Sequence, residues 1–257
     1  MRMSILQEMK LLDHRVLGTN LLELVLQTPP SYMVEPGQFV TIQVDEGNEL
    51  LLRRPFSVAD FDSEQGHLHV IYKVVGVGTE RMRTWEVGQM VSVMGPLGQG
   101  FPLLLANQDE IKKPRLLIGG GVGLAPLYYL AKVLAAKQIP LVIAAGFRSA
   151  DEAFYLEAFQ QLGEVIVATE DGSLGEAGYV TQYLPAQDRW ELYYACGPRP
   201  MLDVLTQQLS GKLGYLSLEE RMACGIGVCQ GCVHPSTKPF RVCTDGPVVA
   251  ASEVESR

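Results

Sequence analysis

The sequence predicts a multidomain β + α/β protein: an antiparallel β-barrel, a doubly wound α/β domain and a small C-terminal domain rich in cysteine. Three observations support this prediction. Short runs of alternating residues extend to about Pro102, strands alternate with helices from Arg115 onward, and four of the five cysteines lie near the C-terminal end. We therefore expect three domains, at 1–104, 105–212 and 213–257.

The barrel is predicted from alternation. In Val40–Asp45 the apolar residues Val40, Ile42 and Val44 alternate with polar ones, and Leu68–Val74 shows the same period of two. Glycine turns such as that at Gly66 separate the runs. Many short strands joined by such turns are typical of a small antiparallel barrel.

The second domain is predicted from strands that alternate with helices. Continuous apolar runs at Leu116–Ile118 and Pro140–Gly146 are expected to be buried strands of a parallel sheet. Ser149 and Glu152 have the spacing of a capping box, which predicts a helix that carries Tyr155, Leu156, Phe159 and Leu162.

Charge and hydropathy exclude several classes of partner. The chain has 21 basic and 29 acidic residues, a formal net charge of −8, so we expect binding neither to nucleic acid nor to anionic lipid. The most apolar stretch, Leu124–Ala136, contains Lys132 and is too short to span a bilayer. Met1–Arg15 lacks the apolar core of a signal peptide, and we expect a cytoplasmic protein.

The cysteines have the most specific spacing in the chain. Cys224, Cys229 and Cys232 are separated by four and two residues, and Cys243 follows. With glycines between the ligands, this is the spacing of a plant-type [2Fe–2S] centre. A structural zinc site is the alternative, although such sites usually have two similar paired spacings.

A second motif, Arg54, Pro55, Phe56 and Ser57, follows an apolar run in the barrel. The arginine can pair with a flavin pyrophosphate, and the serine hydroxyl can reach a flavin ring nitrogen. Taken alone, the motif is more typical of a surface turn. Further backbone and small-residue contacts are expected from Ile71, Tyr72 and Lys73 and from Gly78 and Thr79.

A third motif, Gly119, Gly120, Gly121 and Gly123, lies between a predicted strand and a predicted helix, as in a nucleotide-binding turn. A generic tight turn is the alternative. Cys196 follows another strand, at the sheet edge where such folds bind ligands, although a buried core thiol is equally compatible with its position.

In this order the motifs resemble those of the ferredoxin–NADP reductase superfamily. With the cysteine segment, the whole chain is similar to the iron–sulfur flavoprotein subunits of two-subunit, NAD-dependent dihydroorotate dehydrogenases. The resemblance implies FAD at Arg54, Pro55, Phe56, Ser57, Ile71, Tyr72, Lys73, Gly78 and Thr79. It implies a [2Fe–2S] cluster on Cys224, Cys229, Cys232 and Cys243. It also implies NAD at Gly119, Gly120, Gly121 and Gly123, with Asp171 at the adenosine ribose and Cys196 near the nicotinamide.

The resemblance further implies a partner. A catalytic subunit that carries FMN would oxidise dihydroorotate, and electrons would pass through the cluster and FAD to NAD, in pyrimidine biosynthesis and in a heterotetramer of two plus two subunits. One alternative is a similar reductase subunit of another complex, such as a hydrogenase or a ferredoxin:NADP transhydrogenase. A zinc-containing module that binds nucleotides without turnover is another.

Overall fold

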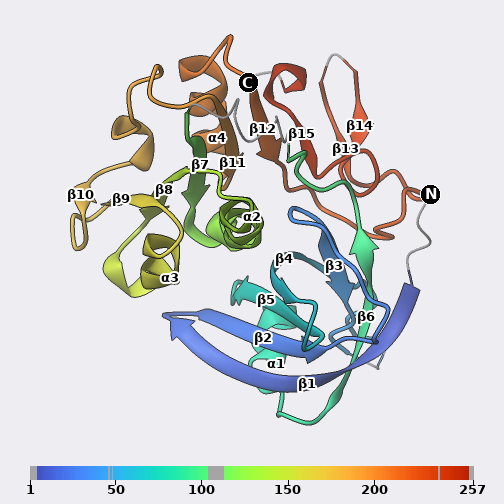
Figure 1. The fold of residues 1–257 in the computed structure, drawn as a ribbon. Coiled ribbons are helices and arrows are strands. Elements are labelled where there is room, and N and C mark those ends of the chain that lie inside the picture. The colour runs from blue at the N-terminus through green and yellow to red at the C-terminus, as the bar shows by residue number, and fades with distance from the viewer. Residues whose placement is uncertain (1–4, 46, 48, 104–112, 237, 255–257) are drawn as a thin grey trace.

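The computed structural model describes residues 5–45, 47, 49–103, 113–236 and 238–254 (Figure 1). The predicted boundary between residues 104 and 105 lies outside the described residues. The first part of the chain is a closed antiparallel barrel with the strand order β1-β2-β5-β4-β3-β6. Its strands are β1 (Ile5–Gly18), β2 (Leu21–Gln27), β3 (Phe39–Ile42), β4 (Arg54–Asp62), β5 (His67–Lys73) and β6 (Met90–Leu97). The predicted barrel is confirmed.

Apolar side chains that point inward form the core of the barrel. Leu24, Val40 and Val70 come from three different strands and are fully buried in one core. The short helix α1 (Val77–Met82) follows β5, and its Met82 is buried in the same core. Alternation therefore predicts the inner face of these strands correctly.

The second part is a seven-stranded sheet with the order β10-β9-β8-β7-β11-β12-β15. The strands are β7 (Arg115–Gly120), β8 (Leu141–Phe147), β9 (Glu164–Thr169), β10 (Glu176–Ala177), β11 (Leu192–Cys196), β12 (Gly214–Ser217) and β15 (Val248–Ala250). The helices are α2 (Leu124–Ala136), α3 (Leu156–Gln160) and α4 (Arg199–Gln208). All neighbouring strands are parallel except β12 and β15.

Helices cover both faces of this sheet, as the doubly wound prediction requires. Leu117 of β7 packs with Leu127 and other residues of α2, whereas its neighbour Leu116 packs with Leu202 and Leu205 of α4. Successive residues of a strand point to opposite faces, so one continuous apolar run serves both helix layers.

Residues 219–247, here called the cysteine lobe, lie between β12 and β15 and contain the short strands β13 (Val233–His234) and β14 (Phe240–Arg241). Since β12 and β15 both belong to the seven-stranded sheet, the lobe is held to it at both ends. Figure 1 shows the lobe beside the barrel strands β3 and β6. The domain boundaries at 104 and 212 stay predictions.

The capping-box prediction is wrong. Ser149 precedes a 3₁₀ turn at Ala150–Glu152 and its side chain makes no cap hydrogen bond, while α3 begins only after Tyr155, which has a left-handed backbone (φ 59°). The carboxylate of Glu152 instead accepts a hydrogen bond from Lys73 Nζ on the barrel, at 2.7 Å. A contact between domains thus replaces the local cap.

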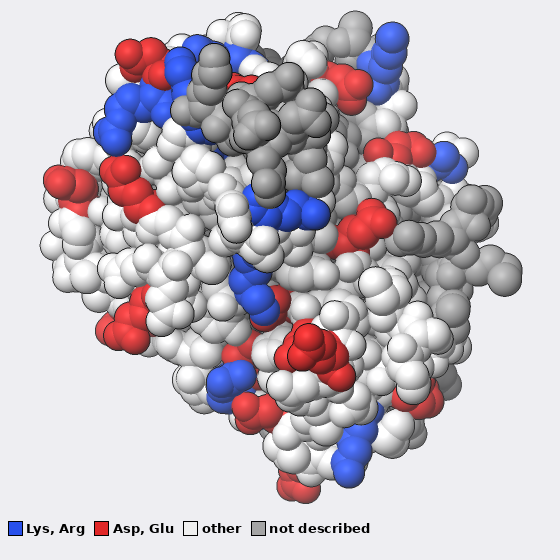
Figure 2. Space-filling view, viewed as in Figure 1, with Lys and Arg blue, Asp and Glu red and all other residues white. Residues whose placement is uncertain are grey.

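Two further features concern the surface. Among the described residues, no helix combines the length and apolarity that crossing a membrane would require. Figure 2 shows acidic and basic side chains interspersed on the visible face, with broad uncharged areas between them.

Candidate functional site

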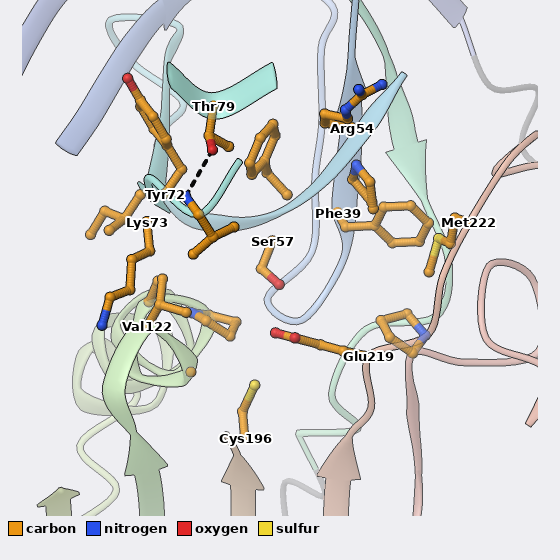
Figure 3. Close-up of a pocket in the computed structure, with 18 of the residues that line it drawn as sticks. Phe39, Arg54, Ser57, Tyr72, Lys73, Thr79, Val122, Cys196, Glu219 and Met222 are labelled. Carbon is orange, nitrogen blue, oxygen red and sulfur yellow. Dashed lines mark hydrogen bonds between the residues drawn. The ribbon is translucent and has the colours of Figure 1, made fainter. Parts of the chain in front are cut away.

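A cavity of about 580 Å³ lies where the barrel, the seven-stranded sheet and the cysteine lobe meet (Figure 3). From the barrel it is lined by Phe39, Arg54, Pro55, Phe56, Ser57, Ile71, Tyr72, Lys73, Val75, Gly76, Val77, Gly78 and Thr79. From the sheet domain it is lined by Val122, Gly123, Ala125, Pro126 and Cys196. Leu218, Glu219, Glu220, Met222 and Pro247 complete it. Every residue predicted to hold FAD lies at this one cavity.

Arg54 lies over the first turn of α1. A Cβ atom at Gly78 would come within 2.9 Å of Arg54 Nε, so any larger residue there would require the guanidinium to shift from this position. The guanidinium also donates to the carbonyl oxygen of Leu52. A positive charge next to the backbone of this turn suits a pyrophosphate.

Thr79 stabilises the turn itself. Its hydroxyl accepts hydrogen bonds from the backbone N–H groups of Val75 and Gly76, at 3.0 and 3.2 Å, and donates to the Gly76 carbonyl. The Thr79 hydroxyl, which is predicted to contact the cofactor, therefore makes its hydrogen bonds within residues 75–79. These residues line the cavity.

The Tyr72 ring is held from two sides. Its hydroxyl is 3.0 Å from His14 Nε2, and its ring meets the Phe56 ring edge to face with centroids 6.0 Å apart. His14 Nδ1 lies 3.1 Å from the carbonyl oxygen of Trp85. Burial raises the pKa of the Tyr72 phenol, so that it remains protonated. Sequence analysis assigned no role to His14, whose position behind Tyr72 follows from pairing of β1, β2 and β5.

The glycine turn after β7 approaches the Cys196 loop closely. A Cβ atom at Gly123 would lie 2.7 Å from the Gly197 Cα atom, and one at Gly120 would lie 2.8 Å from Pro198 Cδ. Gly121 has a left-handed backbone (φ 52°), with nothing within 4 Å of its Cβ position. Gly119 is the last but one residue of β7, and of the four predicted glycines only Gly123 lines the cavity.

Cys196 and Glu219 face the cavity from the carboxyl ends of neighbouring strands (Figure 3). Burial, with the nearby Glu219 carboxyl group, raises the pKa of the Cys196 thiol to about 12. Burial also raises the pKa of Glu219, whose carboxyl group points toward Ser57 in Figure 3. Sequence analysis missed Glu219. Its position just beyond β12, at the ligand-binding edge of a parallel sheet, is the feature that could have identified it.

Asp171 lies outside the cavity, in the exposed turn after β9. Its Oδ1 atom accepts hydrogen bonds from Ser173 Oγ and Ser173 N, at 2.5 and 3.0 Å, and these lower the pKa of its carboxyl group. β9 and the strand before the glycine turn end at the same edge of the sheet. The ribose contact stays a prediction.

The four cysteines of the lobe form two pairs. The backbone N–H of Cys229 donates to Cys224 Sγ and that of Cys243 to Cys232 Sγ, each at 3.4 Å, while the N–H of Gly231 reaches Cys229 Sγ at the same distance. Burial alone would raise the pKa of the Cys224 thiol, but hydrogen bonds from the backbone N–H groups of Cys229, Ile226 and Val228 and from the Cys229 side chain lower it to about 6.

These pairs fit a two-iron centre. In the described part of the chain, no three His, Cys, Asp or Glu side chains converge on one metal position. Two cysteines for each of two irons, with backbone N–H groups directed at sulfur, match the donor set of a [2Fe–2S] cluster. Cys196 lies in β11 and belongs to neither pair.

The lobe shares a core with the barrel and the sheet. Cys232 and Cys243 are buried in the same apolar cluster as Phe39 and Leu97 of the barrel, and Met222 packs against that cluster while lining the cavity. The cysteines are therefore joined to the cavity through continuous packing.

A buried histidine connects the lobe to α4. Arg199 Nη1 lies 2.9 Å from His234 Nε2, and His234 Nδ1 lies 2.8 Å from Glu220 Oε1. Because arginine only donates, Nε2 must accept, which assigns the ring proton to Nδ1. Sequence analysis gave His234 no role, since nothing local indicates that it packs against α4.

Three family models match the chain. One described as "Iron-sulfur cluster binding domain of dihydroorotate dehydrogenase B" matches residues 219–255. An FAD-binding domain matches residues 6–125, and an oxidoreductase NAD-binding domain matches residues 117–207. The chain thus has domains for an iron–sulfur cluster, FAD and NAD, and the zinc alternative is not supported.

Curated relatives match almost end to end. The "Dihydroorotate dehydrogenase B (NAD(+)), electron transfer subunit" of Shouchella clausii is 44% identical over 239 residues, which cover 90% of this chain and 91% of that one. The protein of the same name from Bacillus cereus strain B4264 is 43% identical over 256 residues, covering 96% and 98% of the two chains.

Solved structures show the same fold. A chain of an NADH-dependent reduced ferredoxin–NADP oxidoreductase superposes with a TM-score of 0.84 at 29% identity, over 96% of this chain and 89% of that one. The ferredoxin reductase of carbazole 1,9a-dioxygenase superposes with a TM-score of 0.66 at 24% identity, over 81% and 66%. The latter supports the fold alone.

Proposed function

The chain belongs to the family of electron transfer subunits of dihydroorotate dehydrogenase B, and from this premise we propose how its residues divide the work. It is an oxidoreductase subunit that links an iron–sulfur cluster, FAD and NAD in pyrimidine biosynthesis. A single observation carries the residue assignments: one cavity is lined by the Arg54–Ser57 motif, the Cys196 loop and the base of the cysteine lobe.

The flavin is assigned to the barrel side of the cavity. FAD exchanges two electrons with nicotinamide and single electrons with a cluster, so it belongs between the two. Arg54 with residues 75–79 suits the pyrophosphate, and Ser57 faces the middle of the cavity. Ile71, Tyr72 and Lys73 form the neighbouring wall.

The nicotinamide nucleotide is assigned to the sheet side. Gly121 leaves open space at the start of α2, and Cys196 presents a protonated thiol and Glu219 a carboxyl group of raised pKa to the cavity. The surroundings disfavour a charge on either group, so both can serve as hydrogen-bonding groups beside the nicotinamide. Asp171 is assigned to the adenosine ribose.

The proposed partner is the catalytic subunit that the name of these electron transfer subunits implies. We assign to that subunit an FMN, and to the complex two copies of each chain. The cysteine lobe offers an apolar contact surface on which the subunit can dock. Val228 is 76% exposed, and Ile226 is also exposed, close to the half-buried Cys224. A cytoplasmic location is part of the proposal, since thiolate ligands need a reducing compartment.

Docking at the lobe can be tested with a matched pair of variants. Val228→Asp adds a charge at the lobe, whereas Val16→Asp adds one at an equally exposed position of barrel strand β1 (74%). With the catalytic subunit added, Val228→Asp should abolish NAD reduction by dihydroorotate and spare NADH:ferricyanide activity. Val16→Asp should spare both. Loss of neither activity in Val228→Asp would remove the lobe from the interface.

The flavin assignment has its own matched pair. Arg54 lines the cavity, while its neighbour Arg53 donates to Gln43 Oε1 and Ser92 outside it. Arg54→Ala should lose FAD on gel filtration because a charge-assisted contact to the pyrophosphate is removed. Arg53→Ala should retain it. Equal flavin content in the two variants would remove Arg54 from the site.

A reductase subunit of another complex, such as a hydrogenase or a ferredoxin:NADP transhydrogenase, is not favoured. The relatives named as dihydroorotate dehydrogenase B subunits are 42–44% identical over nearly the whole chain, whereas the ferredoxin–NADP oxidoreductase chain is 29% identical. Co-purification of the second subunit is the direct test.

A further inference from the structure

A buried hydroxyl group on the barrel has no hydrogen-bond partner. Thr41, in the middle of β3, is 2% exposed, and its Oγ1 atom has no partner among the described residues. Burying a hydroxyl without a partner is unfavourable, and such groups in folded proteins usually have a partner that the protein atoms alone do not supply.

The cysteine lobe covers Thr41. The alternation of β3 directs Val40 and Ile42 into the barrel core and Thr41 outward. Gly225 lies on that outer side: a Cβ atom at Gly225 would be 3.2 Å from Thr41 Cγ2 and 3.4 Å from Leu97 Cδ1. Gly225 follows the first cysteine ligand, so Thr41 lies directly beneath the ligand loop.

We propose that the Thr41 hydroxyl donates a hydrogen bond to an inorganic sulfide of the iron–sulfur centre and thereby raises the reduction potential of the cluster. This inference rests on the proposed cluster ligands. A threonine hydroxyl rotates to suit an acceptor, and hydrogen bonds to the sulfurs are among the factors that set cluster potentials.

The donor would come from outside the lobe. The hydrogen bonds that reach Cys224, Cys229 and Cys232 sulfur come from backbone N–H groups of the lobe itself. Thr41 instead belongs to the barrel, where it pairs with Pro55 of the flavin motif across β3 and β4. Thr41 thus contacts the cysteine lobe with its side chain. Its backbone position in the sheet lies opposite Pro55 of the flavin motif.

Removal of the hydroxyl tests the proposal in the purified full-length protein. Thr41→Val keeps the size and branching of the side chain, and Thr41→Ser keeps the hydroxyl. At a fixed solution potential, the ratio of reduced to oxidised cluster, measured by paramagnetic resonance, should fall about tenfold in Thr41→Val. For a one-electron couple this is a midpoint about 59 mV lower. Thr41→Ser should keep the parent midpoint.

A second buried hydroxyl provides the control. Tyr32 OH also has no partner among the described residues, but it is packed in the barrel core, edge to face with Phe61. Tyr32→Phe should leave the cluster midpoint unchanged. If Thr41→Val does not retain iron, the cluster midpoint is measured in Thr41→Ala, whose smaller side chain leaves more space beside Gly225.

Failure of the proposed cluster ligands and failure of the Thr41 inference give different results. A parent protein with no iron, no sulfide and no paramagnetic signal on reduction would contradict the proposed cluster ligands. A parent protein with an intact cluster whose midpoint equals that of Thr41→Val would overturn the Thr41 inference alone, and would assign the hydroxyl to a water molecule.

Discussion

The barrel meets the rest of the chain at two interfaces that differ in their charged contacts. At the interface with α2 and α3, here called the polar interface, Ala59 and Ile71 of the barrel share an apolar cluster with Leu127, and two charged pairs are added. Asp60 is bonded to Lys132 Nζ at 2.5 Å and Lys73 Nζ to Glu152 at 2.7 Å. At the interface with the cysteine lobe, here called the apolar interface, Phe39 and Leu97 lie in one cluster with the buried cysteines. The two interfaces flank the same cavity.

Glu23 shows how the polar interface is built. This fully buried carboxylate on β2 accepts hydrogen bonds from Tyr155 OH at the start of α3 and from His69 Nδ1 at 2.7 Å, and it pairs with Arg15 Nε at 2.8 Å. Burial by itself would raise the pKa of Glu23, but the hydrogen bonds from His69 and Tyr155, with the charge of Arg15, hold it below its usual value.

The difference between the two interfaces suits the two electron transfers of the flavin, one with the nucleotide and one with the cluster. In the proposed arrangement a nucleotide enters and leaves between the barrel and the sheet domain, and polar groups at an interface can exchange their partners for water at low cost. A cluster has to stay at a fixed distance from the flavin, because one-electron transfer weakens steeply with distance. A close-packed apolar interface provides that fixed distance.

The largest effect is expected at the apolar interface. Leu97→Ala should lower the free energy of unfolding by about 2–5 kcal/mol, since it opens a cavity beneath the lobe, and should speed loss of cluster iron to a chelator. Met90→Ala, at an exposed position of the same strand β6, is the control and should change neither. Equal iron loss from the two variants would show that the lobe does not depend on this packing.

At the polar interface, Glu23→Gln should cost roughly 1.5–3 kcal/mol of unfolding free energy, the usual value of hydrogen bonds to a buried charge. Urea denaturation measures it. Glu157→Gln, which changes an exposed carboxylate on α3, should be neutral. A neutral Glu23→Gln would mean that the barrel and α3 are held by their apolar contacts alone.

The Glu23 contribution should also depend on pH. Since the pKa of Glu23 is lower in the folded protein than its ordinary value of 4.5, the stabilisation is fully present above that value. It is lost as the pH falls through the folded-state pKa. The difference in unfolding free energy between parent and Glu23→Gln, measured from pH 7 downward, should therefore shrink only in acid. A difference that disappears between pH 7 and 6 would point to another group.

The smallest effect is expected for the partly exposed pair of Lys132 and Asp60. Lys132→Ala should cost about 0.2–1 kcal/mol and less at high salt, because the lysine is accessible to solvent. Arg189→Ala removes a pair with Glu164 that does not cross the domain interface. If Lys132→Ala and Arg189→Ala lower the unfolding free energy by the same amount, the Lys132 pair contributes no more than an exposed pair within one domain.

Local patterns predicted most of the fold and only part of the site. Alternation and the glycine turns identified the barrel and the parallel sheet, and all residues predicted to hold FAD line one cavity. What local patterns could not show is how distant segments pack. Thr41 is buried because the cysteine lobe covers it. Glu152 accepts a hydrogen bond from Lys73 in place of the predicted helix cap. Glu219 likewise acquires its position only when β12 joins the sheet.

The central claim is that one chain connects nicotinamide, flavin and cluster. Anaerobic titration of the purified protein with NADH, followed by visible absorbance and paramagnetic resonance, tests it most directly. The account predicts that the flavin bands bleach and that a reduced [2Fe–2S] signal appears in the same titration without the catalytic subunit. Flavin that bleaches with no cluster signal at any NADH concentration, in protein that contains two irons per chain, would contradict it.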